Sequence, residues 1–141
     1  MILLDTHVWI WWVQNDPRIE SATSILDAVP PADIAVSAIS CWEVAALHAR
    51  ARLVFDCPLD EWLRAALHEA AVSIANLTPT IAIESERLPG EFHRDPADRM
   101  LVASARILSC ELLTADHKIW FFTDFREWKT EGGGEGTDCI P

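Results

Sequence analysis

The sequence predicts a single α/β domain with a central parallel sheet of about four to five strands and helices on both faces. Two observations predict this fold class. Short apolar runs alternate along the chain with longer segments of helical periodicity, and strands that are buried on both faces have such continuous apolar sequences. The chain has 141 residues, half of them hydrophobic, which is enough for one hydrophobic core.

Four segments have the composition of buried strands, because each is short, largely apolar and bounded by polar or turn-forming residues. The expected strands are Met1–Leu4, Ile34–Val36, Val72–Leu77 and Glu111–Thr114. Helical segments separate them, as in a sheet whose parallel strands are joined by crossover connections.

The helical segments have amphipathic spacing, and several begin at a proline, which suits the first turn of a helix. They are residues 6–14, 17–28, 38–52, about 59–67, 79–88 and 96–108, followed by a short helix from Lys118. The end of the chain contains Gly132, Gly133 and Gly134, and we expect residues 130–141 to be a disordered tail. The folded domain is therefore expected to span residues 1–129.

Composition excludes several classes of function. Acidic residues outnumber basic ones by 22 to 11, and a formal net charge of -11 argues against broad electrostatic coating of nucleic acid. The four cysteines form no CxxC pair, which predicts neither a zinc knuckle nor a disulfide framework, and reduced thiols are typical of a cytoplasmic protein. The apolar patch at residues 8–13 is too short for a membrane span.

Four acidic residues lie at the ends of otherwise apolar segments: Asp5, Glu43, Asp98 and Asp116. Asp5 follows the first expected strand and Asp116 follows the last. In open parallel sheets the carboxyl ends of the strands form the edge where ligands bind. Acids gathered at one point must be neutralised, and a divalent cation that prefers oxygen ligands does so.

Each of these acids also has a simpler explanation. Asp5 and Asp116 are suited to cap the helices that follow them, and Asp98 would gain from the dipole at the start of its helix. Asp95 is better explained as a helix cap than as a ligand, because it directly precedes Pro96 at the first helical position.

Glu43 is harder to explain structurally. On a helix, Ile39 and Leu47 lie within about 40° of it, so its carboxylate points along an apolar stripe. No lysine or arginine stands three or four residues away on either side. A buried carboxylate without a partner is costly, so Glu43 needs a base, a proton or a metal ion.

Taken together, the acids and the residues around them resemble the PIN-domain family, and within it the VapC-like ribonuclease toxins of type II toxin-antitoxin modules. The resemblance covers Met1 to about Phe125. It rests on four motifs, namely residues 2–7 (ILLDTH), 40–44 (SCWEV), 93–103 (HRDPADRMLVA) and 112–116 (LLTAD).

The resemblance implies a Mg²⁺- or Mn²⁺-dependent endoribonuclease with Asp5, Glu43, Asp98 and Asp116 as catalytic metal ligands. Thr6 and Thr114 match auxiliary hydroxyl positions beside the metal, although a threonine at a strand end more often bonds to local backbone. Oxygen-only ligands suit Mg²⁺ or Mn²⁺ better than zinc. The sequence leaves open whether one or two ions bind and which RNA is cut, with transfer RNA as one candidate.

Positive charge for substrate phosphates is expected from the residues that flank the acids, which are Arg94, Arg99, His117 and Lys118. The alternative for Arg99 and Lys118 is that they solvate helix surfaces. His7 and His93 are also candidates to lie near the site, but a backbone hydrogen bond is at least as good an explanation for each.

The resemblance further implies a cognate VapB-like antitoxin and a homodimer. Trp9, Trp11 and Trp12 cannot all face inward from one helix, so at least one ring should be partly exposed, as in a groove that takes a partner helix. Core packing is the alternative use of these rings. An acidic toxin would also favour a basic inhibitor segment.

Other functions compete with the nuclease. A catalytically inactive PIN-like module that binds RNA or protein would keep the fold and lose a ligand, whereas all four acids are present here. A dehalogenase-like phosphotransferase would need a second aspartate two residues after Asp5, where this chain has His7. A response receiver would need a downstream lysine in register, for which the sequence offers no clear position.

Overall fold

Four parallel strands form the central sheet, in the spatial order β3-β2-β1-β4. In the computed structural model, which describes residues 1–92 and 94–116, they are β1 (Ile2–Leu4), β2 (Ile34–Ser37), β3 (Ser73–Ala75) and β4 (Glu111–Leu113). All four lie within the expected strand segments except for one residue at the end of β2. The predicted parallel α/β fold is confirmed.

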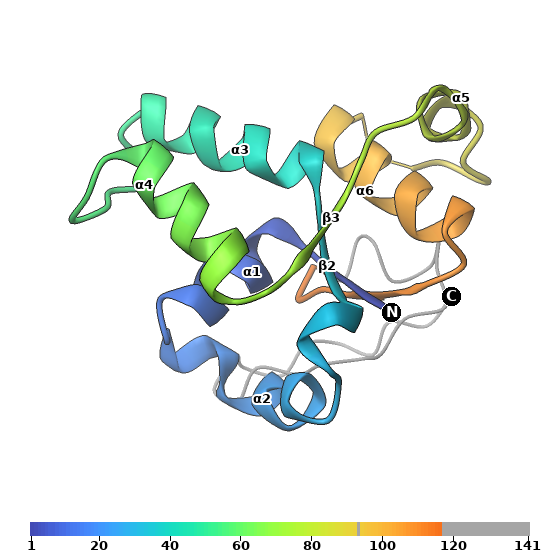
Figure 1. The fold of residues 1–141 in the computed structure, drawn as a ribbon. Coiled ribbons are helices and arrows are strands. Elements are labelled where there is room, and N and C mark those ends of the chain that lie inside the picture. Colours follow the sequence, from blue (N-terminus) through green and yellow to red (C-terminus); the bar gives the residue numbers. More distant parts are fainter. Residues whose placement is uncertain (93, 117–141) are drawn as a thin grey trace, which may run out of the picture.

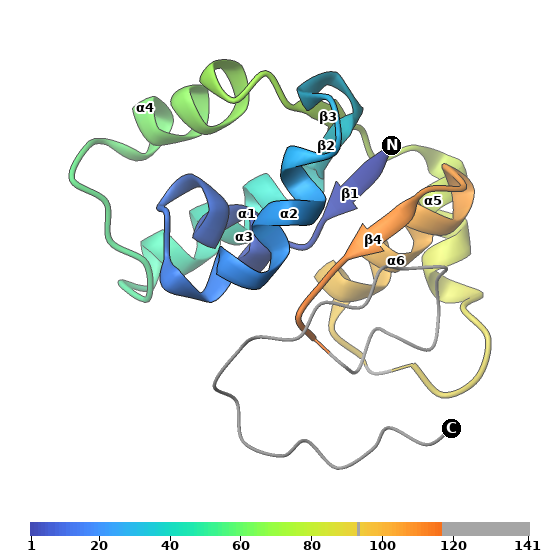
Figure 2. The ribbon, with the colours of Figure 1, turned by 90° about the horizontal axis from the view of Figure 1, so that it is seen from below.

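Helices cover both faces of the sheet (Figures 1 and 2). One face carries α1 (Thr6–Val13), α2 (Glu20–Asp27), α3 (Ala38–Ala49) and α4 (Leu59–Arg64), and the other carries α5 (Pro79–Glu86) and α6 (Pro96–Ile107). Each layer of helices has its own hydrophobic core against the sheet.

Successive side chains of β1 point alternately into these two cores. Ile2 and Leu4 point into the core beneath α1 to α4, whereas Leu3 points into the core beneath α5 and α6. All three side chains are at most 4% exposed, so the strand is buried on both faces. This double burial explains why the strands appear in the sequence as unbroken apolar runs.

Several helices differ in detail from the sequence-based expectation. The segment expected as one helix over residues 17–28 is a 3₁₀ turn (Pro17–Ile19) followed by α2, and a second 3₁₀ turn (Pro31–Asp33) leads into β2. Helix α4 continues as a single π-helical turn over Ala65–Glu69. The helix expected from Lys118 and the tail at 130–141 lie outside the described residues.

Helix ends in this chain use left-handed residues other than glycine. Ala51 has φ of 55° just beyond α3, and Asn15, Ala71 and Ser109 take similar values after other helices. At Ala51 the chain closes by two backbone bonds, Ala51 N to His48 O at 3.0 Å and Arg52 N to Leu47 O at 2.9 Å. This is a Schellman ending, at which a Cβ atom is unfavourable.

The tryptophans of α1 differ in burial, as predicted. Trp9 is fully buried in the core, while Trp11 and Trp12 are partly exposed and pack at its margin. Within residues 1–92 and 94–116 no helix is long and apolar enough to cross a membrane.

Candidate active site

The first acid, Asp5, lies where β1 ends beside β4. Its backbone N–H donates to Leu113 O at 3.0 Å, which extends the strand pairing by one residue, and its carboxylate Oδ2 accepts a hydrogen bond from the Thr114 hydroxyl at 2.6 Å. Asp5 occupies the capping position of α1 but makes no side-chain capping hydrogen bond. The capping explanation for Asp5 is therefore wrong.

Glu43 reaches the same edge of the sheet from α3. Its Oε1 accepts a hydrogen bond from the Thr6 hydroxyl at 2.6 Å, and Thr6 Oγ1 lies 2.8 Å from the hydroxyl oxygen of the buried Ser40. Ser40 and Val44 face the core, so Glu43 emerges at the margin of the buried stripe. In the described structure the hydrogen-bond partner of the Glu43 carboxylate is therefore a hydroxyl group, not a basic side chain.

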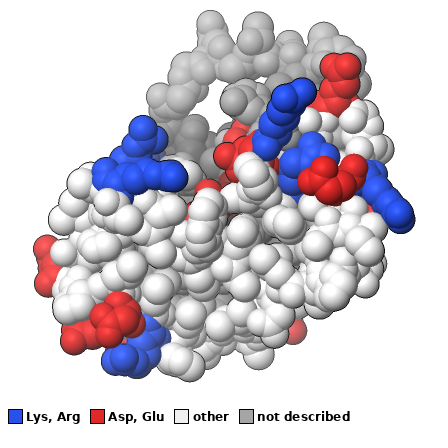
Figure 3. All heavy atoms as spheres, turned by 90° about the horizontal axis from the view of Figure 1, so that it is seen from above, with Lys and Arg blue, Asp and Glu red and all other residues white. Residues whose placement is uncertain are grey.

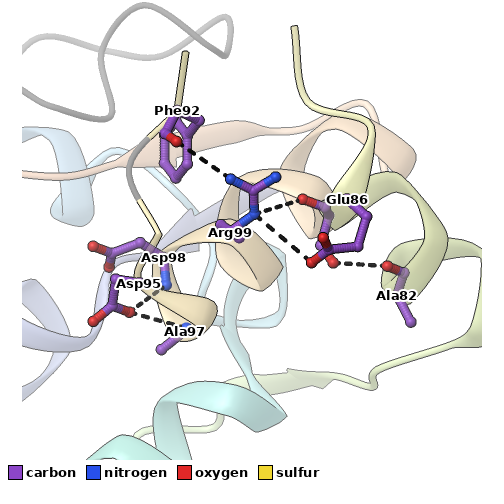
Figure 4. Close-up of polar contacts among 8 residues, drawn as sticks. Ala82, Glu86, Phe92, Asp95, Ala97, Asp98 and Arg99 are labelled. Atoms are coloured by element: carbon purple, nitrogen blue, oxygen red, sulfur yellow. Dashed lines mark hydrogen bonds and ion pairs between the residues drawn. The ribbon is translucent and has the colours of Figure 1, made fainter. Parts of the chain in front are cut away.

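Asp98 enters the site from the first turn of α6. Asp95 caps this helix, as predicted, because its Oδ1 accepts from Ala97 N at 3.0 Å and Asp98 N at 3.1 Å. Figure 4 shows the carboxylates of Asp95 and Asp98 on one side of this turn and Arg99 on the other, directed toward α5. The cap thus holds two acids on the same side of the helix end.

Asp116 completes the group from beyond β4. Its backbone N–H donates to the Thr114 hydroxyl at 2.9 Å, and that hydroxyl in turn donates to Asp5. Thr114 therefore links two of the four predicted acids. Both threonine hydroxyls bond to carboxylates, and Thr114 also accepts a bond from local backbone, so the local alternative accounts for only part of their contacts.

The acids are partly buried and lie near enough to one another for their negative charges to interact. Burial raises the pKa of Asp98 to about 7, with further increases from the negative charges of Asp5, Asp95, Glu43 and Asp116. Burial also raises the pKa of Glu43, helped by the charges of Asp5 and Asp95 and opposed by the Thr6 hydrogen bond. The structure therefore brings all four predicted acids together, and adds Asp95.

Asp5 is the most deeply buried of these acids, at 6% exposed. Burial raises the pKa of its carboxyl group, while the hydrogen bond from Thr114 and the charge of His7 oppose that rise. A site that raises the pKa of three carboxyl groups disfavours their charged forms. Positive charge bound among these carboxylates would stabilise their charged forms.

Acidic side chains gather in a recess of the surface seen in Figure 3, with basic side chains beside them and a largely uncharged surface around. Within residues 1–92 and 94–116 no three histidine, cysteine, aspartate or glutamate side chains are close enough together to form a ready metal site. Carboxylates without a counter-ion repel one another, and the charges of neighbouring acids add to the effect of burial on the pKa of Asp98 and of Glu43.

The predicted phosphate contacts have different surroundings. Arg99 lies under the loop before α6, donating to Ser85 O at 2.9 Å and Phe92 O at 3.3 Å, with 18% of its side chain exposed (Figure 4). Its bonds join α5 to α6, so the alternative of a solvated helix surface is wrong for Arg99. We expect Arg99 to stabilise the fold rather than to contact a phosphate. Arg94 is exposed beside Asp95. His117, Lys118 and His93 lie outside the described residues.

Sequence reasoning missed the supporting residues of the site rather than its acids. The positions of Ser40 and of the Thr6–Glu43 pair depend on how α1 packs against α3, which the local sequence does not determine. The small residues of the SCWEV motif were a partial signal, since a serine three residues before Glu43 lies on the adjoining side of the same helix.

A sequence profile of the PIN domain matches residues 2–124. The chain belongs to the PIN domain family. This PIN domain is 35% identical over 119 residues to Ribonuclease VapC22 of Mycobacterium tuberculosis, a match that covers 84% of the chain and 88% of that protein. The resemblance to the PIN family and its VapC members is thereby confirmed.

Solved structures share the PIN fold. VapBC2 from Rickettsia felis, bound to a promoter DNA fragment, superimposes with a TM-score of 0.68 at 16% identity, covering 92% of this chain and 100% of that chain. The sarcin-ricin loop cleaving toxin VapC20 of Mycobacterium tuberculosis gives 0.61 at 19% identity, covering 90% and 100%. A toxin-antitoxin complex from Klebsiella pneumoniae gives 0.61 at 23% identity, covering 85% and 90%.

Proposed function

We propose that this protein is a Mg²⁺- or Mn²⁺-dependent endoribonuclease that hydrolyses RNA phosphodiester bonds and acts as the toxin of a toxin-antitoxin pair. The observation that carries the proposal is the group of acids contributed by four distant segments, where burial, together with the negative charges of the neighbouring acids, raises the pKa of Asp98 to about 7. The relationship to Ribonuclease VapC22 supports the same activity.

The donor set fits a hard divalent cation. Asp5, Glu43, Asp98 and Asp116 offer only oxygen ligands, which Mg²⁺ and Mn²⁺ prefer over the nitrogen and sulfur ligands typical of zinc. A cation bound by these four residues would supply positive charge to the scissile phosphate and to the water that attacks it. It would also relieve the repulsion among the acids, which adds to the effect of burial on the pKa of Asp98.

The surrounding side chains orient the acids. The hydroxyls of Thr114 and Thr6 each hold one carboxylate oxygen, of Asp5 and Glu43 respectively, and leave the second oxygen of each for a cation. Asp95 fixes the first turn of α6, and with it the position of Asp98. No protein nucleophile is needed, because water performs the attack.

Substrate phosphates need positive charge in addition to the cation. Arg94 is exposed directly before Asp95 and is the arginine we assign to this contact among the described residues. His117 and Lys118 follow Asp116 in the sequence and remain candidates. Transfer RNA is the first substrate class to test.

We also propose a VapB-like antitoxin as partner, a homodimer as the assembled form and the cytoplasm as the location. The structural relatives from Klebsiella pneumoniae and Rickettsia felis are toxin-antitoxin complexes, which supports the first of these. The net charge of -11 favours an inhibitor with a basic segment. Size-exclusion chromatography with light scattering tests the dimer.

The direct test is cleavage of purified transfer RNA by the full-length protein with Mg²⁺, Mn²⁺ or EDTA. We expect cleavage with either metal ion and none with EDTA, and we expect Asp5→Asn and Asp98→Asn to lose more than 100-fold of the rate, about 2.7 kcal/mol of transition-state stabilisation. Asp27→Asn, an exposed acid on α2, should cleave normally.

The alternatives give different results. RNA binding without cleavage by the folded wild type would indicate the inactive binding module. Formation of a phospho-aspartate with a small phosphodonor would indicate a phosphotransferase or a receiver. Either result would reject the nuclease.

A further inference from the structure

A row of aromatic and cationic side chains leads away from the acids along α1. It consists of His7, Trp11 and Arg18. His7 and Trp11 stand one helical turn apart, with ring centroids 6.1 Å apart and planes at 75°, and the guanidinium carbon of Arg18 lies 4.4 Å from the Trp11 ring centroid. Contacts therefore join all three side chains.

The orientation of Arg18 is fixed by Asp16. The Arg18 Nε and Nη2 atoms donate to the two carboxylate oxygens of Asp16 at 2.9 and 2.7 Å, and the backbone N–H of Arg18 also donates to Asp16 Oδ1. This fork holds the guanidinium over the Trp11 ring. The guanidinium is accessible from outside, because 58% of the Arg18 side chain is exposed.

The row begins at the acids. His7 follows Asp5 by two residues and lies in the first turn of α1. His7 is exposed, whereas its neighbours Thr6 and Val8 are buried. The row is thus continuous with the site and lies on the outer side of α1.

The charge of the protein limits how it can hold RNA. With a net charge of -11, the surface as a whole repels a phosphate backbone, so affinity must come from the cation, from a few placed bases or from contacts that do not depend on net charge. Stacking of nucleobases on aromatic rings and on arginine planes is such a contact, and it tolerates any base.

We propose that the row His7, Trp11 and Arg18 binds the single-stranded RNA segment next to the scissile phosphate, with one base stacked on the exposed guanidinium of Arg18. This inference rests on the proposed function. The base would extend the stack that Trp11 and Arg18 already form, so no side chain needs to be ordered on binding. The row would then position the strand without selecting its sequence.

Arg18→Lys is the sharpest test, because it keeps the charge and removes the planar surface. We expect a 5- to 100-fold rise in KM for Mg²⁺-dependent cleavage of a mixed-sequence 12-nucleotide RNA, with kcat unchanged. Arg64→Lys, an exposed arginine on α4, is the matched control and should leave KM unchanged.

A backbone-only competitor separates stacking from charge. A 12-residue tetrahydrofuran-phosphate oligomer has the phosphates of RNA and no bases, so we expect it to inhibit wild type and Arg18→Lys equally. Trp11→Leu should raise KM in the same direction as Arg18→Lys, and Trp12→Leu controls for the loss of a half-buried indole from the same helix.

The outcomes separate this inference from the proposed function. A wild-type protein that does not cleave RNA with metal would reject the function and the row together. Normal cleavage with an unchanged KM for Arg18→Lys would reject the row alone. Weaker binding of an antitoxin by Arg18→Lys, with KM unchanged, would assign the row to the inhibitor and also overturn the inference.

Discussion

The Thr114 hydroxyl donates a hydrogen bond to Oδ2 of Asp5 at 2.6 Å and joins two residues that are 109 positions apart. Parallel pairing of β1 with β4 produces this contact, because Leu4 is opposite Leu113 and the next residues are therefore neighbours. Both side chains are buried. The bond ties the ends of the two strands and orients an acid of the site.

Replacing Thr114 with valine keeps the shape of the side chain and removes this bond. The Asp5 carboxylate then loses its donor in a buried position, so we expect a loss of about 1.5–3 kcal/mol in the free energy of unfolding at pH 7, measured by urea denaturation. Thr80→Val on the exposed side of α5 is the control. Equal losses for the two variants would contradict the role given to the bond.

Removing one charge from the site should stabilise the metal-free protein. Asp98→Asn relieves repulsion from Asp5, Asp95, Glu43 and Asp116 at pH 8. The shift in its pKa corresponds to about 4 kcal/mol, which solvent screening of a half-buried group reduces to about 1 kcal/mol. We expect Tm to rise by about 2–5 °C in EDTA, measured by calorimetry, whereas Asp27→Asn should not change it. A fall in Tm would show that Asp98 is held by favourable contacts.

The stability of the metal-free protein should fall as pH rises from about 4 to about 7. The pKa of Asp98 is raised from 3.8 to about 7 on folding, so between these values the folded protein binds more protons than the unfolded chain. The contribution of protonated Asp98 is complete below pH 4 and is lost as pH passes 7. Urea midpoints between pH 4.5 and 8.5 measure this slope, and Asp98→Asn should flatten it. A urea midpoint of the wild type that rises with pH across this range would contradict the prediction.

Arg99 is predicted to stabilise the fold rather than bind substrate. Its guanidinium donates to Ser85 O and Phe92 O, and a lysine cannot make both bonds from the same place. Arg99→Lys should lower the free energy of unfolding by about 2 kcal/mol. Arg94→Ala, which changes an exposed arginine, should leave stability unchanged and raise KM for RNA. If Arg99→Lys does not change the free energy of unfolding, the structural role is wrong and Arg99 is again a candidate phosphate contact.

Glycine at the end of α3 should stabilise the protein. Ala51 has φ of 55°, where its Cβ is unfavourable, so Ala51→Gly should gain about 0.5–1 kcal/mol after allowing for the greater freedom of glycine in the unfolded chain. Ala49→Gly, at the last helical position of α3, should lose a similar amount. Denaturant titration measures the change in the free energy of unfolding for each variant. A loss of stability at both positions would contradict the prediction for Ala51→Gly.

The strands and the acids could be predicted from the sequence for a physical reason. A strand buried on both faces must be an apolar run, and an acid at its end stands out against that run. The partners of the acids could not be predicted. The bond from Thr114 to Asp5 depends on strand register, and the bond from Thr6 to Glu43 depends on how α1 packs against α3.

Arg99 is a second residue whose contacts could not be predicted from the local sequence. Its position beside Asp98 in the sequence favoured a phosphate contact, but the next residue on a helix points about 100° away. The packing of α5 against α6 provides the carbonyl groups to which it bonds. Local sequence indicates which residues are charged, while the neighbours of those charges come from tertiary contacts.

Titration with Mn²⁺, followed by electron paramagnetic resonance of the free ion, tests the central claim most directly. We expect the full-length protein to bind Mn²⁺, Asp5→Asn and Asp98→Asn each to weaken binding by about tenfold or more, and Asp27→Asn to bind like the wild type. Equal Mn²⁺ affinity in the wild type, Asp5→Asn and Asp98→Asn would contradict the claim.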